Sequence, residues 1–324
     1  METAKFRNPL VFTKIPLNLP LKFLQFVCIM KTRREFLKIT LGSLLLADAV
    51  SGCRAGVSSR SSWKTGVSSR SSWKIGITDW DLRSTGRIDS FAVAKELGYE
   101  GVQVSYVPEG QDSLADRANR PKYLAAAKAA GVSIASFCIG TLNNRPFATT
   151  PEAAGWVEDC LNAMVEMKVD QVLVPFFGNA DMTEHKDHLP IAIEKLKRLA
   201  PIAGKNKKIL AIESYLTAED HLKMIDAIGS NAVKVYYDVT NSKNKNYDIF
   251  HEMELLGKNK MISQIHFKED RKLLGEGDIN FTRVCETLEK IAYNGWVIVE
   301  GSTSGNWKES QIANAQFVKN LIGR

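Results

Sequence analysis

Four residues of metal-ligating types each close an apolar run in the last third of the chain. They are Glu213, Asp238, His266 and Glu300. The runs before them are rich in β-branched and aromatic residues, and each is followed by a helical pattern, which predicts parallel strands covered on both faces. In a closed barrel of such strands, every carboxyl end opens on the same face. We therefore expect the four side chains to converge at one mouth.

The chemistry of this set is that of a hard divalent cation. Three carboxylates and one imidazole favour Mn²⁺, Mg²⁺ or Co²⁺, and Zn²⁺ also fits. An ion held in this way would act as a Lewis acid on the carbonyl of a bound sugar. Glu213 and Glu300 close strands that are well separated around the ring, so they can approach the sugar from opposite faces. One glutamate would remove a proton and the other would return it, through a metal-stabilised enediolate.

The chain that positions these residues alternates strand and helix patterns. Predicted strands cover 75–78, 101–106, 132–138, 169–176, 208–213, 233–238, 262–267 and 296–300, with one helix after each. Removing the first 75 of the 324 residues leaves 249, close to the roughly 250 that are typical of an eightfold βα barrel. An open doubly wound sheet has the same order of elements, but no Gly-x-Gly-x-x-Gly follows the first strand. These features favour an α/β fold of the (β/α)8 TIM barrel type for residues 75–324 over an open sheet, and the family resemblance described below implies the same barrel.

The first 53 residues have the pattern of an export leader. Residues 32–38 contain paired arginines and precede a short apolar stretch at 39–50, which is typical of a twin-arginine signal peptide. Cys53 closes a sequence that resembles a bacterial lipobox, so we expect lipidation at Cys53 and a periplasmic or extracytoplasmic protein held to the membrane by lipid alone. Ordinary cleavage after nearby small residues is the alternative. Met30 stands where such a signal begins and is the expected start of translation.

Residues 54–74 predict a flexible tether between the leader and the barrel. The nine residues at 56–64 recur without change at 66–74. The repeat is rich in serine and lacks an apolar stripe, so it cannot bury a core.

The formal net charge of +7 is unevenly distributed. Residues 1–75 carry thirteen Lys or Arg side chains against three acidic ones, which is a net +10 and leaves −3 for the rest. The predicted barrel therefore has no overall positive excess that would favour nucleic acid as a partner.

Five short motifs in the last third carry a family resemblance. They are Ala-Ile-Glu at 211–213, Tyr-Asp-Val-Thr-Asn at 237–241, Gln-Ile-His-Phe-Lys-Glu-Asp at 264–270, Leu-Gly-Glu-Gly-Asp-Ile at 274–279 and Val-Glu at 299–300. In these motifs the chain resembles the sugar phosphate isomerase/epimerase superfamily of xylose isomerase-like TIM barrels, which includes the ketose 3-epimerases. The resemblance implies that Glu213, Asp238, His266 and Glu300 bind one divalent metal ion and that the two glutamates also shuttle protons.

The same resemblance suggests substrate contacts. Asn241 stands where ketose 3-epimerases usually carry a histidine, and Glu219 falls where they have a second glutamate after the fifth strand. Their arginine beyond the strand-seven histidine corresponds to Arg271 or Lys272. With Lys268 from the same motif, the residues predicted to bind substrate are Glu219, Asn241, Lys268 and Arg271.

Other polar residues give weaker signals. Asp79, Trp80, Glu109 and Arg145 follow the first strands and are suggestive of substrate choice, while Phe176, Phe177 and Trp307 are candidates to line a pocket. The remaining histidines lie in helical or loop patterns and are expected to be solvated surface groups; they are His185, His188, His221 and His251.

The function predicted from these features is that of an exported, metal-dependent sugar isomerase or epimerase. Export favours an unphosphorylated sugar, since sugar phosphates are mainly cytoplasmic. Two alternatives stay open: a sugar or inosose-type dehydratase or lyase on the same barrel, and a non-catalytic sugar-binding lipoprotein. The sequence is compatible with a homo-oligomer, and it does not select the sugar, the carbon or the metal.

Overall fold

The computed structural model describes residues 72–301, 303 and 305–324. The predicted leader, with Met30 and Cys53, and the tether up to residue 71 lie outside the described residues. Within the described part of the chain, no helix is both long and apolar enough to cross a membrane.

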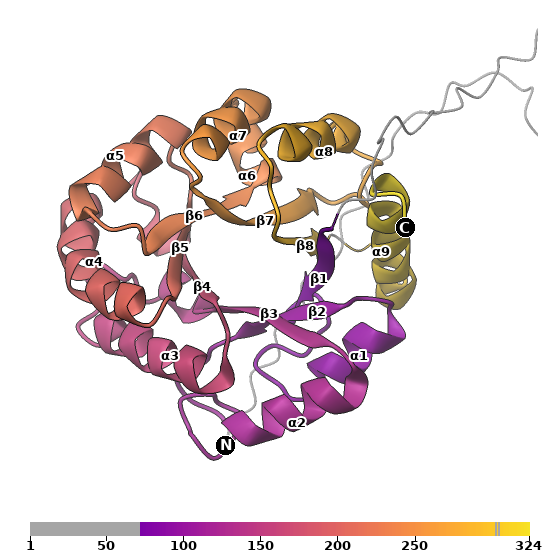
Figure 1. Ribbon diagram of the computed structural model, residues 1–324, viewed down its shortest axis with the longest axis horizontal. Helices are drawn as coiled ribbons and strands as arrows, with labels where there is room; N and C mark the ends of the chain where they lie inside the picture. The colour runs from indigo at the N-terminus through magenta and orange to yellow at the C-terminus, as the bar shows by residue number, and fades with distance from the viewer. Residues whose placement is uncertain (1–71, 302, 304) are drawn as a thin grey trace, which may run out of the picture. The chain divides into compact units, whose positions relative to one another are not determined.

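Eight parallel strands form a closed barrel in chain order, and β1 pairs with β8 to complete the ring. Figure 1 shows the strands as an inner ring surrounded by the helices. Both faces of each strand are thus covered, which explains their continuous apolar sequences. The strands are β1 (Lys74–Thr78), β2 (Gly101–Ser105), β3 (Ser133–Cys138), β4 (Gln171–Phe176), β5 (Ile209–Ser214), β6 (Val233–Asp238), β7 (Ile262–Glu269) and β8 (Trp296–Gly301).

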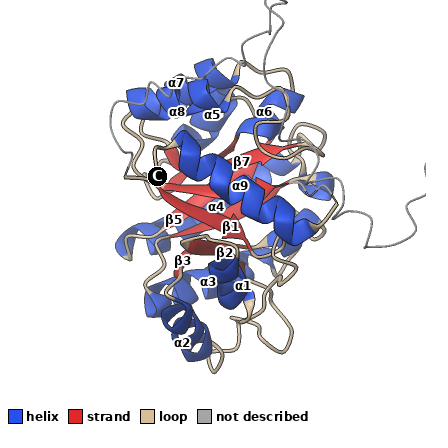
Figure 2. Ribbon diagram, turned by 90° about the vertical axis from the view of Figure 1, so that its right-hand side faces the viewer, coloured by secondary structure: helices blue, strands red, loops and turns tan. Residues whose placement is uncertain are grey.

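The helices lie outside the strands, as the side view in Figure 2 also shows. They are α1 (Ser90–Glu96), α2 (Arg120–Ala130), α3 (Ala153–Met167), α4 (His188–Lys205), α5 (Ala218–Ile228), α6 (Val239–Asn244), α7 (Ile249–Lys258), α8 (Phe281–Lys290) and α9 (Trp307–Leu321). Two short 3₁₀ helices, η1 (Gly140–Asn143) and η2 (Gly178–Ala180), follow β3 and β4.

The predicted pattern of one helix per strand is wrong after β6, where two helices follow. The extra helix, α6, begins directly at the strand end because Asp238 Oδ1 accepts hydrogen bonds from the backbone N–H groups of Thr240 and Asn241, at 2.8 Å each. A side-chain oxygen in this position caps a helix and stabilises its first turn. The segment is short and polar, so it carries no helical periodicity for sequence reasoning to detect.

The barrel begins earlier than predicted. β1 starts at Lys74, and Trp73 is only 2% exposed, with its Nε1 donating to the carbonyl of Tyr293 at 2.7 Å. Trp73 therefore belongs to the barrel rather than to the tether. The last residue lies nearby, since Arg324 donates to the carbonyl of Trp73 and forms an ion pair with Glu100.

Candidate functional site

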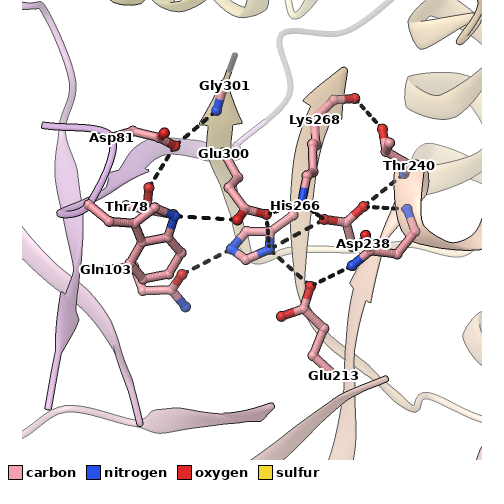
Figure 3. Close-up of polar contacts among 12 residues, drawn as sticks. Thr78, Asp81, Gln103, Glu213, Asp238, Thr240, His266, Lys268, Glu300 and Gly301 are labelled. Atoms are coloured by element: carbon pink, nitrogen blue, oxygen red, sulfur yellow. Dashed lines mark hydrogen bonds and ion pairs between the residues drawn. The ribbon is translucent and has the colours of Figure 1, made fainter. Parts of the chain in front are cut away.

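The four predicted ligands meet at the carboxyl ends of β5 to β8 (Figure 3). Strand register places Asp238 and His266 at the same height along the barrel, because the two residues pair across β6 and β7. One donor atom from each of Glu213, Asp238, His266 and Glu300 lies within 4.8 Å of all the others. The first three residues are buried, and the Glu300 side chain is 21% exposed, toward the mouth.

The imidazole of His266 stands at the centre of this cluster. Its Nδ1 lies 3.3 Å from Glu213 Oε1, 3.4 Å from Glu300 Oε2 and 3.7 Å from Asp238 Oδ2. Its Nε2 lies 2.9 Å from the amide oxygen of Gln103, an acceptor that requires a proton on Nε2. Gln103 therefore turns Nδ1 toward the carboxylates, as a partner of a metal-binding histidine does.

Burial and charge shift the proton affinities of the cluster. Burial raises the pKa of Glu213 to about 7, even though His266 opposes that shift. Burial alone would lower the pKa of His266, but the charges of Glu213 and Glu300 and the bonds to Asp238 and Glu213 raise it to about 10. The three carboxyl groups around Nδ1 therefore favour a positive charge at that position.

The donor set fits a divalent cation. Asp238 Oδ2 is buried and accepts no hydrogen bond within 3.5 Å from the described residues, although Oδ1 of the same carboxylate accepts two backbone N–H groups. Its neighbouring cations, His266 Nδ1 and Lys268 Nζ, lie farther away, at 3.7 and 3.8 Å. A buried carboxylate oxygen without a hydrogen bond is costly unless a cation compensates it. An ion bound by Glu213, Asp238, His266 and Glu300 would do so, and three oxygens with one nitrogen suit Mn²⁺, Mg²⁺, Co²⁺ or Zn²⁺.

A cavity of about 400 Å³ opens beside the cluster. Its walls combine aromatic rings with polar groups, and two of the four donors, Glu213 and Glu300, are among them. A larger hollow of about 730 Å³ lies along α1 and α2, but none of the four donors lines it. The smaller cavity is therefore the candidate substrate site. It is lined by Trp80, Cys138, Gly140, Asn143, Leu173, Pro175, Phe177, Glu213, Tyr215, Asn241, Lys268 and Glu300.

Comparison with known proteins agrees with this architecture. Residues 91–321 match the family of xylose isomerase-like TIM barrels. The chain belongs to this family. No curated protein sequence matches the chain.

Solved structures share the barrel at low sequence identity. The 3-keto-D-glucoside 4-epimerase of E. coli is 16% identical with a TM-score of 0.64, covering 76% of this chain and 99% of the other. A D-psicose 3-epimerase crystallised in the presence of D-fructose is 15% identical with a TM-score of 0.64, covering 78% and 100%. A D-psicose 3-epimerase from Clostridium cellulolyticum with D-tagatose is 17% identical with a TM-score of 0.63, covering 77% and 99%. These likenesses establish the fold.

Two of the four residues predicted to bind substrate, Asn241 and Lys268, lie at the candidate site. Asn241 Nδ2 donates to Glu213 Oε1 at 3.2 Å. Lys268 Nζ lies 3.0 Å from Glu300 Oε2 and 3.8 Å from Asp238 Oδ2. Both side chains also line the cavity, so they are placed to contact a bound molecule.

The other two predicted residues lie elsewhere. Glu219 is in the first turn of α5, where an acidic side chain complements the helix dipole, and it faces solvent beside His251 at 3.5 Å. Arg271 is exposed in the loop after β7, with a left-handed backbone of φ 57°. Neither lines the cavity, so their substrate contacts stay a prediction that the cavity does not support.

The first half of the barrel contributes groups that the sequence did not single out or only suggested. Gln103 is fully buried on β2, and its amide also donates to Ser136 Oγ. Trp80 follows β1, and its Nε1 donates to Glu300 Oε1 at 3.3 Å. The available signals were a lone glutamine inside an apolar strand and a tryptophan directly after another. Of the other suggested residues, Phe177 lines the cavity, whereas Asp79, Glu109, Arg145, Phe176 and Trp307 do not.

Two predicted surface histidines are buried. His188 is 7% exposed and His221 is 4% exposed. His221 Nε2 lies 2.9 Å from Ser214 Oγ and its Nδ1 lies 3.1 Å from the carbonyl of Thr217, so both ring nitrogens have partners. Burial lowers the pKa of His221 to about 4, so the ring is neutral at physiological pH. The sequence pattern placed His221 in a helix or loop but did not show that its side chain packs into the interior.

Proposed function

We propose that the protein is a divalent-metal-dependent sugar isomerase or epimerase. The observation that supports this most is the convergence of Glu213, Asp238, His266 and Glu300 beside a cavity that the two glutamates line. The epimerase activities named for the similar structures agree with this function, although the low identities carry only the fold.

The four clustered residues would hold the ion, which when bound would polarise a sugar carbonyl as a Lewis acid. Glu213 and Glu300 reach the cavity from β5 and β8. One carboxylate removes the proton from the carbon next to the carbonyl, and the other returns a proton to the resulting enediolate. Return on the opposite face changes the configuration, and return on the neighbouring carbon moves the carbonyl.

The two glutamates have different surroundings. Glu213 is 5% exposed and accepts from Asn241, so it is held in place away from water. Glu300 is more exposed and lies between the donors Trp80 and Lys268. Hydrogen bonds to a carboxylate stabilise its charged form. We assign Glu213 as the deeper proton carrier and Glu300 as the carrier nearer the mouth.

The cavity lining supports an unphosphorylated sugar. Among the described residues, no arginine lines it, and the one lysine that does, Lys268, is already paired with Glu300. The carboxylates of Asp238 and Glu300 keep the pKa of Lys268 above its usual value, although burial opposes them. Aromatic side chains from Trp80, Phe177 and Tyr215 offer apolar surface for the C–H faces of a sugar ring.

We also propose that the protein acts outside the cytoplasm. This rests on the twin-arginine pattern, the short apolar stretch and Cys53, all in the sequence before the barrel. N-terminal sequencing and mass spectrometry of the protein recovered from a bacterial host test it. A mature chain that begins at an acylated Cys53 supports the proposal, and a chain that retains the leader contradicts it.

The decisive test of the reaction is hydrogen exchange. Protein loaded with Mg²⁺ is incubated in deuterated water with D-fructose, D-psicose, D-tagatose and a 3-keto-D-glucoside, and each sugar is followed by NMR. Deuterium gain with formation of a new sugar supports an isomerase or epimerase. Loss of water or of an aglycone instead indicates a lyase, and binding without exchange indicates a sugar-binding protein.

A further inference from the structure

Positive charge is concentrated at the end of the barrel opposite the cavity. We define the basic face as the last four residues of each helix that precedes a strand or ends the chain, the loop after it, and the first two residues of each strand. Thirteen basic side chains lie there: Lys74, Lys95, Lys128, Lys168, Lys205, Lys207, Lys208, Lys234, Lys258, Lys260, Lys290, Lys319 and Arg324.

Acidic residues are scarce on the basic face. They are Glu96, Glu100, Glu166, Asp170, Asp226 and Glu289. The rest of the described chain has eighteen basic and twenty-seven acidic side chains, so its charge has the opposite sign. The small negative net charge of the barrel is therefore an average over two oppositely charged parts.

Helix dipoles explain only part of this pattern. Cations near helix carboxyl ends are favourable, which accounts for residues such as Lys95 and Lys128. However, Lys168, Lys207 and Lys260 occupy the turns after α3, α4 and α7 with φ between 55° and 57°. Glycine is the usual residue in this left-handed conformation. Lysine is used at three such turns, each time with an exposed side chain.

Most of these charges are not neutralised within the barrel. Ion pairs on the basic face engage Lys208 with Asp170, Lys290 with Glu254 and Arg324 with Glu100. The other ten basic side chains form no ion pair with any described carboxylate. A surface of this kind attracts a polyanion, and the attraction extends about 10 Å at moderate salt.

The chain preceding the barrel is attached at the same face. Trp73 and Ser72 bond to Tyr293 and Asn294 in the loop before β8. Cys53 lies nineteen residues before Ser72. If residues 54–71 form the flexible tether that their serine-rich sequence predicts, the segment from Cys53 to Ser72 has an end-to-end distance of about 25 Å. A lipid on Cys53 would therefore keep the basic face close to a membrane, and the cavity at the opposite end would face away from it.

We propose that the basic face binds an anionic membrane surface through lipid phosphates. Nucleic acid has the same charge, but the position of the chain entry and of Cys53 favours the membrane. The interaction adds to a lipid anchor, since one acyl chain alone holds a protein only weakly. It also orients the barrel, with the substrate cavity open to the surrounding solution.

The test uses the full chain with Cys53→Ser, so that no acyl chain contributes. Co-sedimentation is measured with phosphatidylcholine vesicles and with vesicles containing phosphatidylglycerol, at low and high salt. The face variant combines Lys128→Gln, Lys168→Gln, Lys207→Gln and Lys260→Gln. The matched control changes four exposed lysines elsewhere to Gln: Lys122, Lys186, Lys197 and Lys223. Circular dichroism and hydrogen exchange with sugar confirm that both variants are folded and active.

The expected result is binding to the phosphatidylglycerol vesicles that falls with salt and weakens about tenfold or more in the face variant, but little in the control. Basic residues before the barrel contribute equally to both proteins, so the difference isolates the face. Equal binding by the two variants, or equal binding to both kinds of vesicle, overturns the proposal. Tighter binding to an RNA duplex than to anionic vesicles, lost in the face variant, overturns the membrane as partner.

Discussion

The two halves of the barrel divide the candidate site between them. β5 to β8 supply every donor atom of the cluster. β1 to β4 and their loops supply Trp80, Gln103 and Asn143, which orient those donors or line the cavity. No charged residue from the first half lines the cavity within the described chain. The second half therefore supplies the charged groups of the site, and the first half supplies uncharged groups that orient them or line the cavity.

The strongest test of this division removes a proton carrier from the second half. Glu213→Gln or Glu300→Gln keeps the shape of the side chain but cannot accept a proton. Each is expected to lower sugar hydrogen exchange about 10²–10⁴-fold, since that is the usual contribution of a general acid or base. Deuterium exchange followed by NMR measures it. Glu219→Gln, at an exposed carboxylate of the same half, is the control, and full activity in both site variants would contradict the assignment.

Removal of the bound ion should affect the second half of the barrel, because that half supplies all four donors. Chelation is expected to abolish hydrogen exchange and to lower the free energy of unfolding, because an ion that binds only the folded state stabilises it. The loss is about 3 kcal/mol when the free ion had been at about 100 times its Kd. Thermal unfolding with and without Mn²⁺ measures this effect. The Glu213→Gln variant should gain little from the ion, and an equal gain in both proteins would place the ion elsewhere.

A first-half residue should change ion affinity without touching the ion. Gln103→Leu removes the acceptor that holds His266 Nε2–H. Loss of such a partner weakens metal binding about 10–100-fold. Calorimetric titration with Mn²⁺ measures the Kd. Ser136→Ala, which removes only the partner of Gln103, is expected to have a much smaller effect. Unchanged affinity in Gln103→Leu would show that β2 does not position the site.

Trp80 offers a milder change in the first half. Trp80→Phe retains a ring against the cavity but loses the N–H group that donates to Glu300. One lost hydrogen bond is worth about 1 kcal/mol, so kcat/KM should fall about fivefold. Trp80→Leu removes the aromatic wall as well and should mainly raise KM. A fall in kcat as large as that of Glu300→Gln would erase the proposed division.

His221 is a buried residue of the second half that we expect to have no role in the site. Its neutral ring has a pKa of about 4 in the folded protein, against an ordinary value of about 6.5 in the unfolded chain. Unfolding therefore takes up a proton between these values, and stability falls as pH drops from about 6.5 to 4, by up to about 3 kcal/mol. His221→Gln should reduce this acid sensitivity in urea unfolding while leaving exchange activity intact. The control His251→Gln changes an exposed ring, and lost activity in His221→Gln would contradict the structural role.

Sequence reasoning predicted the second half of the site better than the first. Each ligand there ends a distinct apolar run, so its strand and its end of the barrel follow from local pattern. Gln103 gives no such signal, because its partner His266 is 163 residues away in the chain. Burial of His221 likewise depends on packing between α5 and β5. These contacts exist only once the ring is formed.

Charge shows the same limit. A net charge for residues 76–324 predicted no polyanion partner, since opposite signs cancel in a sum. The positions of Lys168, Lys207 and Lys260 after α3, α4 and α7 became meaningful only when those helix ends were known to share one face. Local pattern thus predicts elements and their ends, whereas it does not predict which side chains gather from distant parts of the chain.

The pairing of β1 with β8 has a consequence for biosynthesis. The strand that closes the ring also brings the fourth donor, Glu300, so both arrive only when nearly the whole chain has been made. A product truncated before residue 296 lacks the seam and the full coordination set together. If the cluster binds an ion, the complete set of four ligands is therefore available only to a polypeptide that extends through β8.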